Sequence, residues 1–543
     1  MPKLPYLTSV PIAQGIYYQL LKSVSYQFLN QRGNTPEYGK FAGHVDKYAV
    51  FTNTVEKTNN IVSNFDAYEV VIGLEVHAQL LTRTKLFCGD SAAFGGDPNT
   101  HVSPVTLGLP GALPKLNRTA VEFAIKMGLA CHSEIERNNY FARKNYFYPD
   151  LPKGYQISQH TTPICKGGFV HIRTAGGKKD VQLNRIHLEE DAGKSLHDVD
   201  PENTSVDYNR AGVPLIEIVT EPDLRSADEA YAYLTELRKI VRFLGICDGN
   251  MEEGSMRCDA NISIRPKGVT TLGTKVEVKN LNSIRNVKKA IEFETRRMII
   301  LVEEGKAIQQ ETRSFDAADG TTFSLRTKEE ANDYRYFADP DLPPFHVSDA
   351  FLEGIRSSLP ALPEELIARY MHELQLPEYD ARVICDDKET VDYFEKLVKE
   401  TVHYKAAANW LQGPVWSARN EQGFALKDFP VQPVRLARLI QLVEEGRLSF
   451  SIASSRIFPV MLEDTSGDPL DIAITLNLLQ SSDTSEIAAW VEQALARMPD
   501  KVTEYRKGKK GLIGLFVGEV KRLSKGKADP RLTNQLLLEK LEN

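Results

Sequence analysis

The first 36 residues contain no aspartate or glutamate, and their only charged groups are basic. An amphipathic stripe follows helical spacing within this segment: Tyr17, Leu20, Leu21, Val24 and Phe28. A basic, amphipathic start without acidic groups is typical of an organellar transit peptide, although this one is not rich in arginine. We therefore expect residues 1–67 to be an N-terminal extension that carries a transit peptide. An extension without a targeting role is the alternative.

Long apolar runs and paired cysteines are also missing. No run approaches the roughly 18 apolar residues that cross a membrane, so no membrane span is expected. The six cysteines include no C-x-x-C pair, and their spacing suits neither a disulfide framework nor a zinc site. We expect them to be reduced thiols.

Two common catalytic loops are absent as well. The stretch D-A-G-K-S at 191–195 ends like a phosphate-binding loop, but Leu188 occupies the position of the first glycine. No G-x-S-x-G elbow occurs either, which excludes the hydrolases that depend on one.

The chain of 543 residues is too long for one ordinary domain, so two to four are expected. Its content of 42% hydrophobic and 26% charged residues is typical of a globular protein. The net charge of -7 argues against electrostatic binding of nucleic acid over the whole surface. Any such binding must therefore be local.

Residues 68–348 contain short alternating segments separated by glycine, proline and asparagine, which predicts strands. Residues 349–428 are polar and follow helical spacing, most clearly at 363–374. Shorter helices are expected over residues 429–543, and the proline cluster at 339–344 marks a boundary. The sequence thus predicts an α+β protein: an N-terminal β-sheet domain, an all-α helical domain and a small helical tail domain.

Several predicted strands carry chargeable groups on one face, because residues two apart in a strand point the same way. The shared sets are Glu75, His77 and Gln79; Arg185, His187 and Glu189; Glu217 and Glu221; Arg257, Asp259 and Asn261; and Lys275, Glu277 and Lys279. Glu190 falls on the opposite, apolar face or begins a bend. Each set alone is most simply a solvated face. Together, oxygen-rich groups suit magnesium and the basic groups beside them suit phosphate.

Two further segments could contact nucleic acid. Residues 143–159 interleave basic groups with aromatic rings, which can hold phosphates and stack bases. Residues 500–531 contain ten basic and four acidic residues. A packed aromatic loop with exposed lysines and a solvated helical face are the respective alternatives.

Six motifs occur in order: G-L-E-V-H-A-Q-L, R-K-N-Y-F-Y-P-D, H-L-E-E-D-A-G-K-S, P-L-I-E-I-V-T-E-P-D, M-E-E-G-S-M-R-C-D-A-N-I-S and V-K-N-L-N-S. From about Tyr68 to the C-terminus, the chain resembles the B-subunit family of aspartyl/glutamyl-tRNA amidotransferases. The resemblance implies a catalytic "cradle" domain at 68–348, a helical domain at 349–428 and a tRNA-binding tail domain at 429–543.

The resemblance also implies a ligase. ATP and magnesium phosphorylate the side-chain carboxylate of misacylated Glu-tRNA(Gln), and ammonia then gives Gln-tRNA(Gln). An amidase (A) subunit supplies the ammonia, and a small third subunit completes a heterotrimer. In a eukaryote such an enzyme acts in mitochondria or plastids, and with this N-terminus we expect the mitochondrial matrix. We find no amidase signature and no Cys-His glutaminase arrangement, so we expect no release of ammonia from glutamine by this chain alone.

The resemblance and the shared strand faces together suggest roles for individual residues. The expected metal ligands, or groups contacting them, are Glu75, His77, Glu190 and Glu217; with Arg257 and Asp259 they form the expected catalytic set. The expected phosphate or substrate contacts are Lys144, Lys153 and Arg257. The remaining pocket or ammonia-exit residues are expected to be Glu252, Glu253, Asp259 and Asn261.

Many relatives resemble C-x-C followed by C-x-x-C, a structural zinc site. Here only Cys88 remains, and Asp90, Ser103 and Thr106 stand where further ligands would be. One thiolate cannot hold a tetrahedral site, so no zinc is expected. Two other functions remain open: a non-catalytic tRNA-binding scaffold, and a magnesium-dependent phosphohydrolase or nuclease that uses the same carboxylates.

Overall fold

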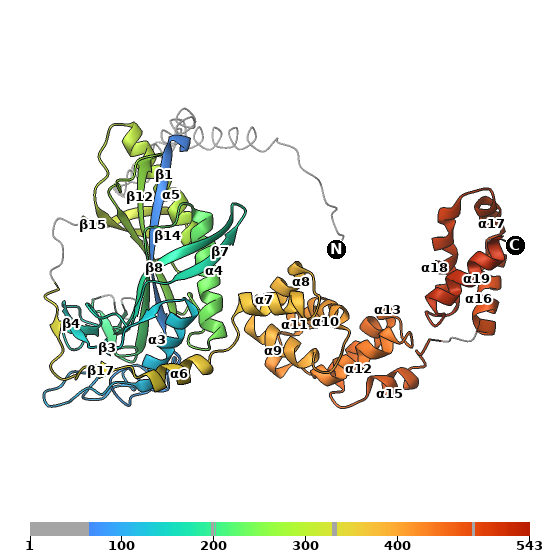
Figure 1. Cartoon of the computed structure of the whole chain (residues 1–543), viewed down its shortest axis with the longest axis horizontal. Helices are drawn as coiled ribbons and strands as arrows, with labels where there is room; N and C mark the ends of the chain where they lie inside the picture. Colours follow the sequence, from blue (N-terminus) through green and yellow to red (C-terminus); the bar gives the residue numbers. More distant parts are fainter. Residues whose placement is uncertain (1–64, 197–199, 201, 328–333, 481–483, 543) are drawn as a thin grey trace, which may run out of the picture. The chain divides into compact units, whose positions relative to one another are not determined.

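The computed structural model describes residues 65–196, 200, 202–327, 334–480 and 484–542 (Figure 1). The expected transit peptide and its amphipathic stripe fall in residues 1–64, outside the described residues. In the part of the chain that is described, none of the helices combines the length and the apolar character needed to cross a membrane.

A large mixed sheet forms the N-terminal part of the protein. From edge to edge its strands are β15 (Thr321–Thr327), β14 (Glu311–Asp316), β13 (Val276–Lys279), β12 (Met256–Pro266), β1 (Tyr68–Gln79), β11 (Pro214–Thr220), β8 (Gly177–Glu190), β5 (Tyr155–Ser158), β4 (Ala142–Asn145) and β16 (Phe337–Ala338). Strands β13 and β14 run parallel, whereas β1 pairs with β11 antiparallel. The strands predicted around His77, Glu189, Glu217, Asp259 and Glu277 are all confirmed.

Short strands extend β8 or pair separately. The strands β2 (Glu134–Ile135), β6 (Cys165–Lys166) and β7 (Phe169–Thr174) join the sheet near β8. Two small ribbons pair β9 (Lys194–Leu196) with β10 (Ser205–Asp207), and β3 (Asn138–Asn139) with β17 (Phe345–His346).

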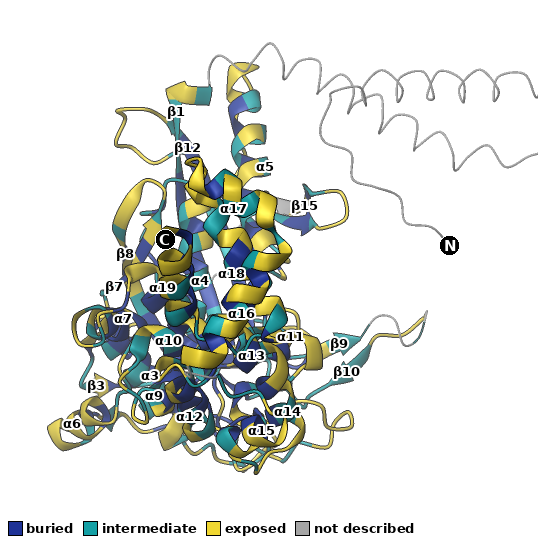
Figure 2. Ribbon diagram, turned by 90° about the vertical axis from the view of Figure 1, so that its right-hand side faces the viewer, coloured by how far each residue is buried: buried dark blue, intermediate teal, exposed yellow. Residues whose placement is uncertain are grey.

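Three helices pack against the sheet: α3 (Arg118–Ala130), α4 (Ala227–Phe243) and α5 (Ile284–Glu303). Ser226 and Ser283 cap α4 and α5 by accepting a backbone N–H bond, as expected at helix starts. Figure 2 shows buried and exposed residues alternating along α5, because its apolar residues follow helical spacing. Most apolar side chains of β1 and β12 are buried, and Val76 and Ala260 are fully so. Their polar neighbours occupy the other face of the sheet.

The rest of the chain is helical. A first group comprises α6 (Asp349–Ser357), α7 (Pro363–His372), α8 (Glu378–Ile384), α9 (Lys388–Leu397), α10 (Tyr404–Trp410), α11 (Trp416–Gln422), α12 (Pro433–Glu444), α13 (Phe450–Ile452), α14 (Phe458–Glu463) and α15 (Pro469–Thr475). A second group comprises α16 (Thr484–Arg497), α17 (Pro499–Arg506), α18 (Ile513–Leu523) and α19 (Pro530–Glu542). Short 3-10 or π turns are η1 (Phe65–Ala67), η2 (Leu411–Val415), η3 (Leu426–Asp428), η4 (Ala453–Ile457) and η5 (Lys510–Leu512).

Helix α6 contacts α3 of the sheet domain, and two separate apolar cores hold the helices from α7 onward. One contains residues from Leu366 to Ala473 together with Phe243 at the end of α4, and the other contains residues from Ile487 to Leu541. The boundary expected at 428–429 lies within the first core, where the Trp410 ring contacts the rings of Phe450 and Phe458. Helical spacing identifies the apolar face of each helix but not which helices share a core. The predicted fold class, a sheet domain followed by an all-helical region, is confirmed.

Candidate active site

Three neighbouring strands bring a row of chargeable side chains together. His77 on β1 lies opposite Glu217 on β11, and Glu217 lies opposite His187 on β8. Cross-strand partners point to the same face of a sheet, so all three project together. Glu189 joins them because it lies two residues beyond His187 in the same strand.

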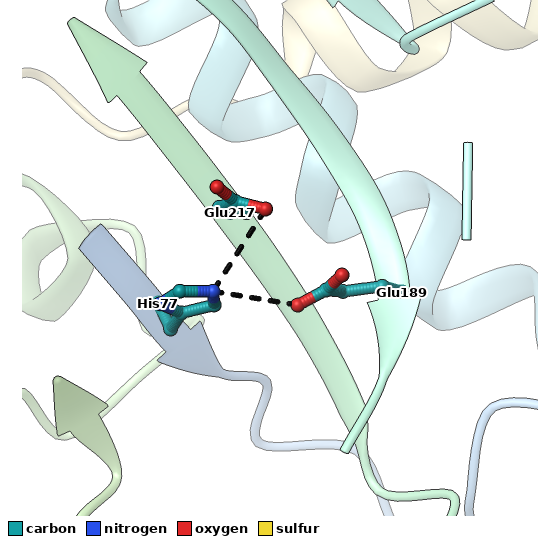
Figure 3. Close-up of side chains that lie close together, drawn as sticks. All are labelled: His77, Glu189 and Glu217. Carbon is teal, nitrogen blue, oxygen red and sulfur yellow. Dashed lines mark ion pairs between the residues drawn. The ribbon is translucent and has the colours of Figure 1, made fainter. Parts of the chain in front are cut away.

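His77, Glu189 and Glu217 form a compact group, which we call the carboxylate trio (Figure 3). His77 Nε2 lies 3.5 Å from Glu189 Oε1 and 3.8 Å from Glu217 Oε2. The exposed fractions of the side chains are 20% for His77, 4% for Glu189 and 12% for Glu217. One ligand atom from each residue lies within 4.8 Å of the others. The trio is therefore largely shielded from water.

His187 supplies a buried positive charge behind the trio. Its Nε2 lies 3.1 Å from Glu217 Oε2 and 3.7 Å from Glu189 Oε2. Burial by itself lowers the pKa of His187, but the two carboxylates raise it to about 9. Burial raises the pKa of Glu217, but the charge and hydrogen bond of His187 hold it well below its usual value. The pair is thus an imidazolium beside a carboxylate.

A second acidic group lies farther along the same face, formed by Glu75, Asp259 and Glu277. Glu75 Oε1 accepts a hydrogen bond from Asn261 Nδ2 at 2.9 Å. Burial and then the charge of Glu217 raise the pKa of Glu75, so a proton binds there more readily. Lys279 Nζ lies 2.5 Å from Asp259 Oδ2 and 3.1 Å from Glu277 Oε1, so this group already contains a cation.

Lys144 is a basic residue on β4, on the side of the trio opposite the second acidic group. Burial lowers the pKa of Lys144, but nearby charges, Glu189 first and Glu217 among the others, hold it above its usual value. Its ammonium group therefore faces the trio as a cation. The charge of Lys144 acts on the two carboxylates of the trio without forming an ion pair with either of them.

Glu190, expected among the metal ligands, lies outside the trio. Its carboxylate accepts hydrogen bonds from Lys153 Nζ at 2.5 and 2.6 Å and from the Ile157 N–H at 2.9 Å. Strand β8 continues without a bend through Glu190, so adjacent residues point to opposite faces. Glu189, for which no role was predicted from the sequence, takes the place expected for Glu190. The alternation that puts Glu189 on the face of His187 was the signal that could have identified it.

Some of the other expected site residues lie on the polar face of the sheet, and others lie in the turn that precedes β12. Arg257 donates to Asp191 Oδ1 at 3.0 Å, and Gln79 donates to Asp191 Oδ2 at 2.7 Å. Glu252 and Glu253 are exposed in the turn before β12, and neither belongs to the two acidic groups found among the described residues. Sequence reasoning assigned no role to His187, Glu277 or Lys279, although it placed each on the correct strand face.

Of the residues at the positions expected for zinc ligands, Cys88, Asp90 and Thr106 are joined by hydrogen bonds. Thr106 Oγ1 donates to Asp90 Oδ2 at 2.5 Å, and Cys88 Sγ donates to the same oxygen at 3.2 Å. Burial raises the pKa of Cys88, which favours the thiol over the metal-binding thiolate. The expected absence of zinc stays a prediction.

The trio's chemistry suits a hard divalent cation. It offers two carboxylates and one imidazole from three strands of one sheet, with no thiol among them. Oxygen-rich donors of this kind favour magnesium over softer metals. A cation held there would face Lys144, so the surface could hold a phosphate group between positive charges.

Comparison with known proteins assigns the family. Residues 70–353 match the GatB/GatE catalytic domain, and residues 392–541 match the GatB domain. The B subunit of the aspartyl/glutamyl-tRNA(Asn/Gln) amidotransferase of Syntrophotalea carbinolica is 52% identical over 475 residues, which cover 87% of this chain and 98% of that protein. Its counterpart in Geotalea daltonii is 52% identical over 478 residues, 88% and 99% of the two chains. That of Thermodesulfovibrio yellowstonii is 48% identical over 476 residues, again 88% and 99%. The chain therefore belongs to the GatB family, the catalytic B subunits of tRNA-dependent amidotransferases, which are ligases.

Proposed function

We propose that this chain converts Glu-tRNA(Gln) to Gln-tRNA(Gln) in two steps on the polar face of the sheet. A side-chain carboxylate oxygen of the esterified glutamate first attacks the γ-phosphorus of ATP, and ADP leaves. Ammonia then attacks the acyl carbon; the bond to the phosphate breaks, inorganic phosphate leaves and the nitrogen loses a proton. Phosphorylation is needed because a carboxylate oxygen is a poor leaving group.

The carboxylate trio carries this proposal. His77, Glu189 and Glu217 would hold magnesium, and their donor types and spacing fit it. Magnesium bound there would neutralise charge on the transferring phosphoryl group. Lys144 would add a second positive charge from the other side, and Lys153 and Arg257 are further candidates for phosphate or substrate contact. Both acidic groups lie on one sheet face, so a substrate could contact both.

A partner would supply the ammonia. The chain has no amidase signature and no Cys-His glutaminase arrangement in its sequence. The relatives are named as subunits, which fits a heterotrimer with an amidase subunit and a small third subunit. The pure chain should release no ammonia from glutamine, and glutaminase activity in the pure chain would overturn this part of the proposal.

The site of action would be the mitochondrial matrix. This location is supported by the first 36 residues, which contain no aspartate or glutamate and carry an amphipathic stripe. A reporter fused to residues 1–67 should enter mitochondria. Retention in the cytosol, or delivery to plastids, would contradict this location.

Reconstitution tests the activity. The chain is combined with its amidase and third subunits, and ATP-dependent conversion of Glu-tRNA(Gln) is measured for wild type and His77→Ala. His77→Ala should lose most of the activity because it removes one of three metal ligands. His372→Ala is the matched control, since His372 is exposed on α7. Full conversion by His77→Ala would remove the trio from the mechanism.

A further inference from the structure

A row of four tyrosines lies beside the site and has no part in the mechanism described so far. Successive ring centroids lie 6.0 Å apart between Tyr336 and Tyr334, 5.9 Å between Tyr334 and Tyr146, and 5.8 Å between Tyr146 and Tyr148. We call these four residues the tyrosine row. Each ring is inclined by 70° to the next, an edge-to-face arrangement.

The strand pairing places this row on the face of the carboxylate trio. Lys144 on β4 lies opposite Gln156 on β5, and Ser158, two residues further, lies opposite Glu189 on β8. Cross-strand partners and residues two apart share a face, so Lys144 projects to the same side as Glu189. Strands β4 and β8 are separated by two interstrand spacings, about 10 Å.

The rings gather around Lys144 on that face. Lys144 Nζ lies 4.9 Å from the centre of the Tyr334 ring and 5.8 Å from that of Tyr146. The Tyr146 hydroxyl donates to Gln156 Oε1 at 3.2 Å, which directs the ring toward the same side. The part of the tyrosine row around Lys144 thus lies at a distance from the trio that one nucleotide can span.

The row is held in place but remains accessible. The His160 ring stacks on Tyr336 with centroids 4.0 Å apart and planes 4° from parallel, so Tyr336 is braced in one orientation. Tyr146, Tyr334 and Tyr336 are only partly buried, and Tyr148 is 52% exposed. Side chains that served only the core would be covered, as the core residues of this sheet are.

Aromatic rings interleaved with cations are the usual surface for unpaired nucleobases. One mononucleotide needs one stacking partner, whereas the row offers several in succession. A single strand whose 3′ end carries the amino acid at the trio would bring successive unpaired bases to this row.

We propose that the tyrosine row stacks the unpaired bases at the 3′ end of the aminoacylated RNA, and so positions the esterified amino acid at the carboxylate trio. This inference rests on the proposed function and names the part of the substrate that the surface receives. The adenine of ATP is the competing occupant, and the experiment separates the two.

Tyr336→Leu and Tyr334→Leu remove the aromatic face, and Tyr336→Phe and Tyr334→Phe keep it. The reconstituted enzyme is assayed for kcat, for KM of Glu-tRNA(Gln) and for KM of ATP. Each leucine variant should raise KM for the tRNA by about tenfold, the effect of losing one stacked base, with kcat at saturation and KM for ATP nearly unchanged. The phenylalanine variants should match wild type. Thermal unfolding of each variant reports whether it folds. Two positions are used so that the test still stands if the leucine variant at one of them fails to fold.

Removal of the base supplies a second measurement. A tRNA with one abasic nucleotide among its unpaired 3′ positions should bind wild type about tenfold more weakly. The leucine variant of the tyrosine that stacks that base should add little to this loss, because the two changes remove one contact, whereas the other leucine variant should add its own loss. Folded leucine variants with unchanged KM for the tRNA would overturn the proposal, and so would an increase confined to KM for ATP. If His77→Ala abolishes conversion while the leucine variants behave as wild type, the proposed function stands and the row's role is wrong. If His77→Ala converts normally, the trio is removed from the mechanism, and if the wild-type enzyme shows no ATP-dependent conversion, the proposed function itself fails.

Discussion

The His187 imidazole lies 3.1 Å from the Glu217 carboxylate, with only 5% and 12% of the two side chains exposed. His187 is also 3.7 Å from Glu189, so one buried cation faces two carboxylates of the trio. A charge in this position stabilises the acidic groups when no other cation is bound. The same two carboxylates lie 3.5 and 3.8 Å from His77 Nε2.

Replacing His187 with alanine should destabilise the protein markedly. The change leaves two buried carboxylates without their cation, and breaking such a pair costs about 3 to 5 kcal/mol. Urea unfolding in the presence of a chelator measures the loss. The matched control is His171→Ala, which breaks the exposed His171–Asp180 pair and should cost less than about 1 kcal/mol. Equal losses in both variants would contradict the buried ion pair.

Adjacent glutamates should differ in their effect on the magnesium requirement. Glu189→Gln should raise the magnesium concentration for half-maximal activity by more than about tenfold, because the trio loses a ligand. Glu190→Gln should shift it by less than about twofold, since that carboxylate pairs with Lys153 outside the trio. Magnesium titration of ADP formation measures both. A larger shift for Glu190→Gln than for Glu189→Gln would mean that Glu190, and not Glu189, belongs to the trio.

The protein should lose part of its stability in acid through Glu311. Burial raises the pKa of Glu311, but hydrogen bonds from Ser324 and Arg313 outweigh this and lower it from 4.5. A lowered carboxyl pKa stabilises the fold above the unfolded value, and this stabilisation is lost as the pH falls through the folded value. The stability difference between wild type and Glu311→Gln should therefore be constant above about pH 5.5 and shrink below pH 4.5. Unfolding curves from pH 7 to pH 3 measure it, with exposed Glu353→Gln as the control. A difference independent of pH would exclude an ionic role for Glu311.

Purified protein should contain less than about 0.1 equivalent of zinc, since the cluster around Cys88 holds one thiol and hydrogen-bonded oxygens. Elemental analysis measures this directly. A chelator should leave the thermal unfolding temperature unchanged. Stoichiometric zinc, lost together with stability in Cys88→Ser, would show that the cluster is a metal site.

The alternation of residues along single strands predicted the polar face well. His77, Glu217, Asp259 and Asn261 were each assigned to the correct side from sequence because the side-chain period of a strand is two. The order of the strands was not available from that period. The division of these side chains into two acidic groups therefore emerges only from the pairing of β13, β12, β1, β11 and β8.

Contacts between segments far apart in the chain could not be predicted from the sequence. Tyr334 and Tyr336 lie nearly 200 residues after Tyr146, and only the pairing of β16 with β4 brings them together. The sequence identified the aromatic stretch at 143–159 but gave no sign of its partner. The core shared across residues 428–429 was missed for the same reason, since spacing within one helix says nothing about its neighbours.

The most direct test of the central claim separates the two chemical steps. The reconstituted enzyme is incubated with ATP, magnesium and Glu-tRNA(Gln) without glutamine or ammonia, and ADP is measured. Wild type should form ADP only when Glu-tRNA(Gln) is present, and later addition of ammonia should give Gln-tRNA(Gln). Glu217→Gln should form almost no ADP, whereas the exposed control Glu400→Gln should match wild type. Normal ADP formation by Glu217→Gln, or Gln-tRNA(Gln) formed without ATP consumption, would contradict phosphorylation at the carboxylate trio.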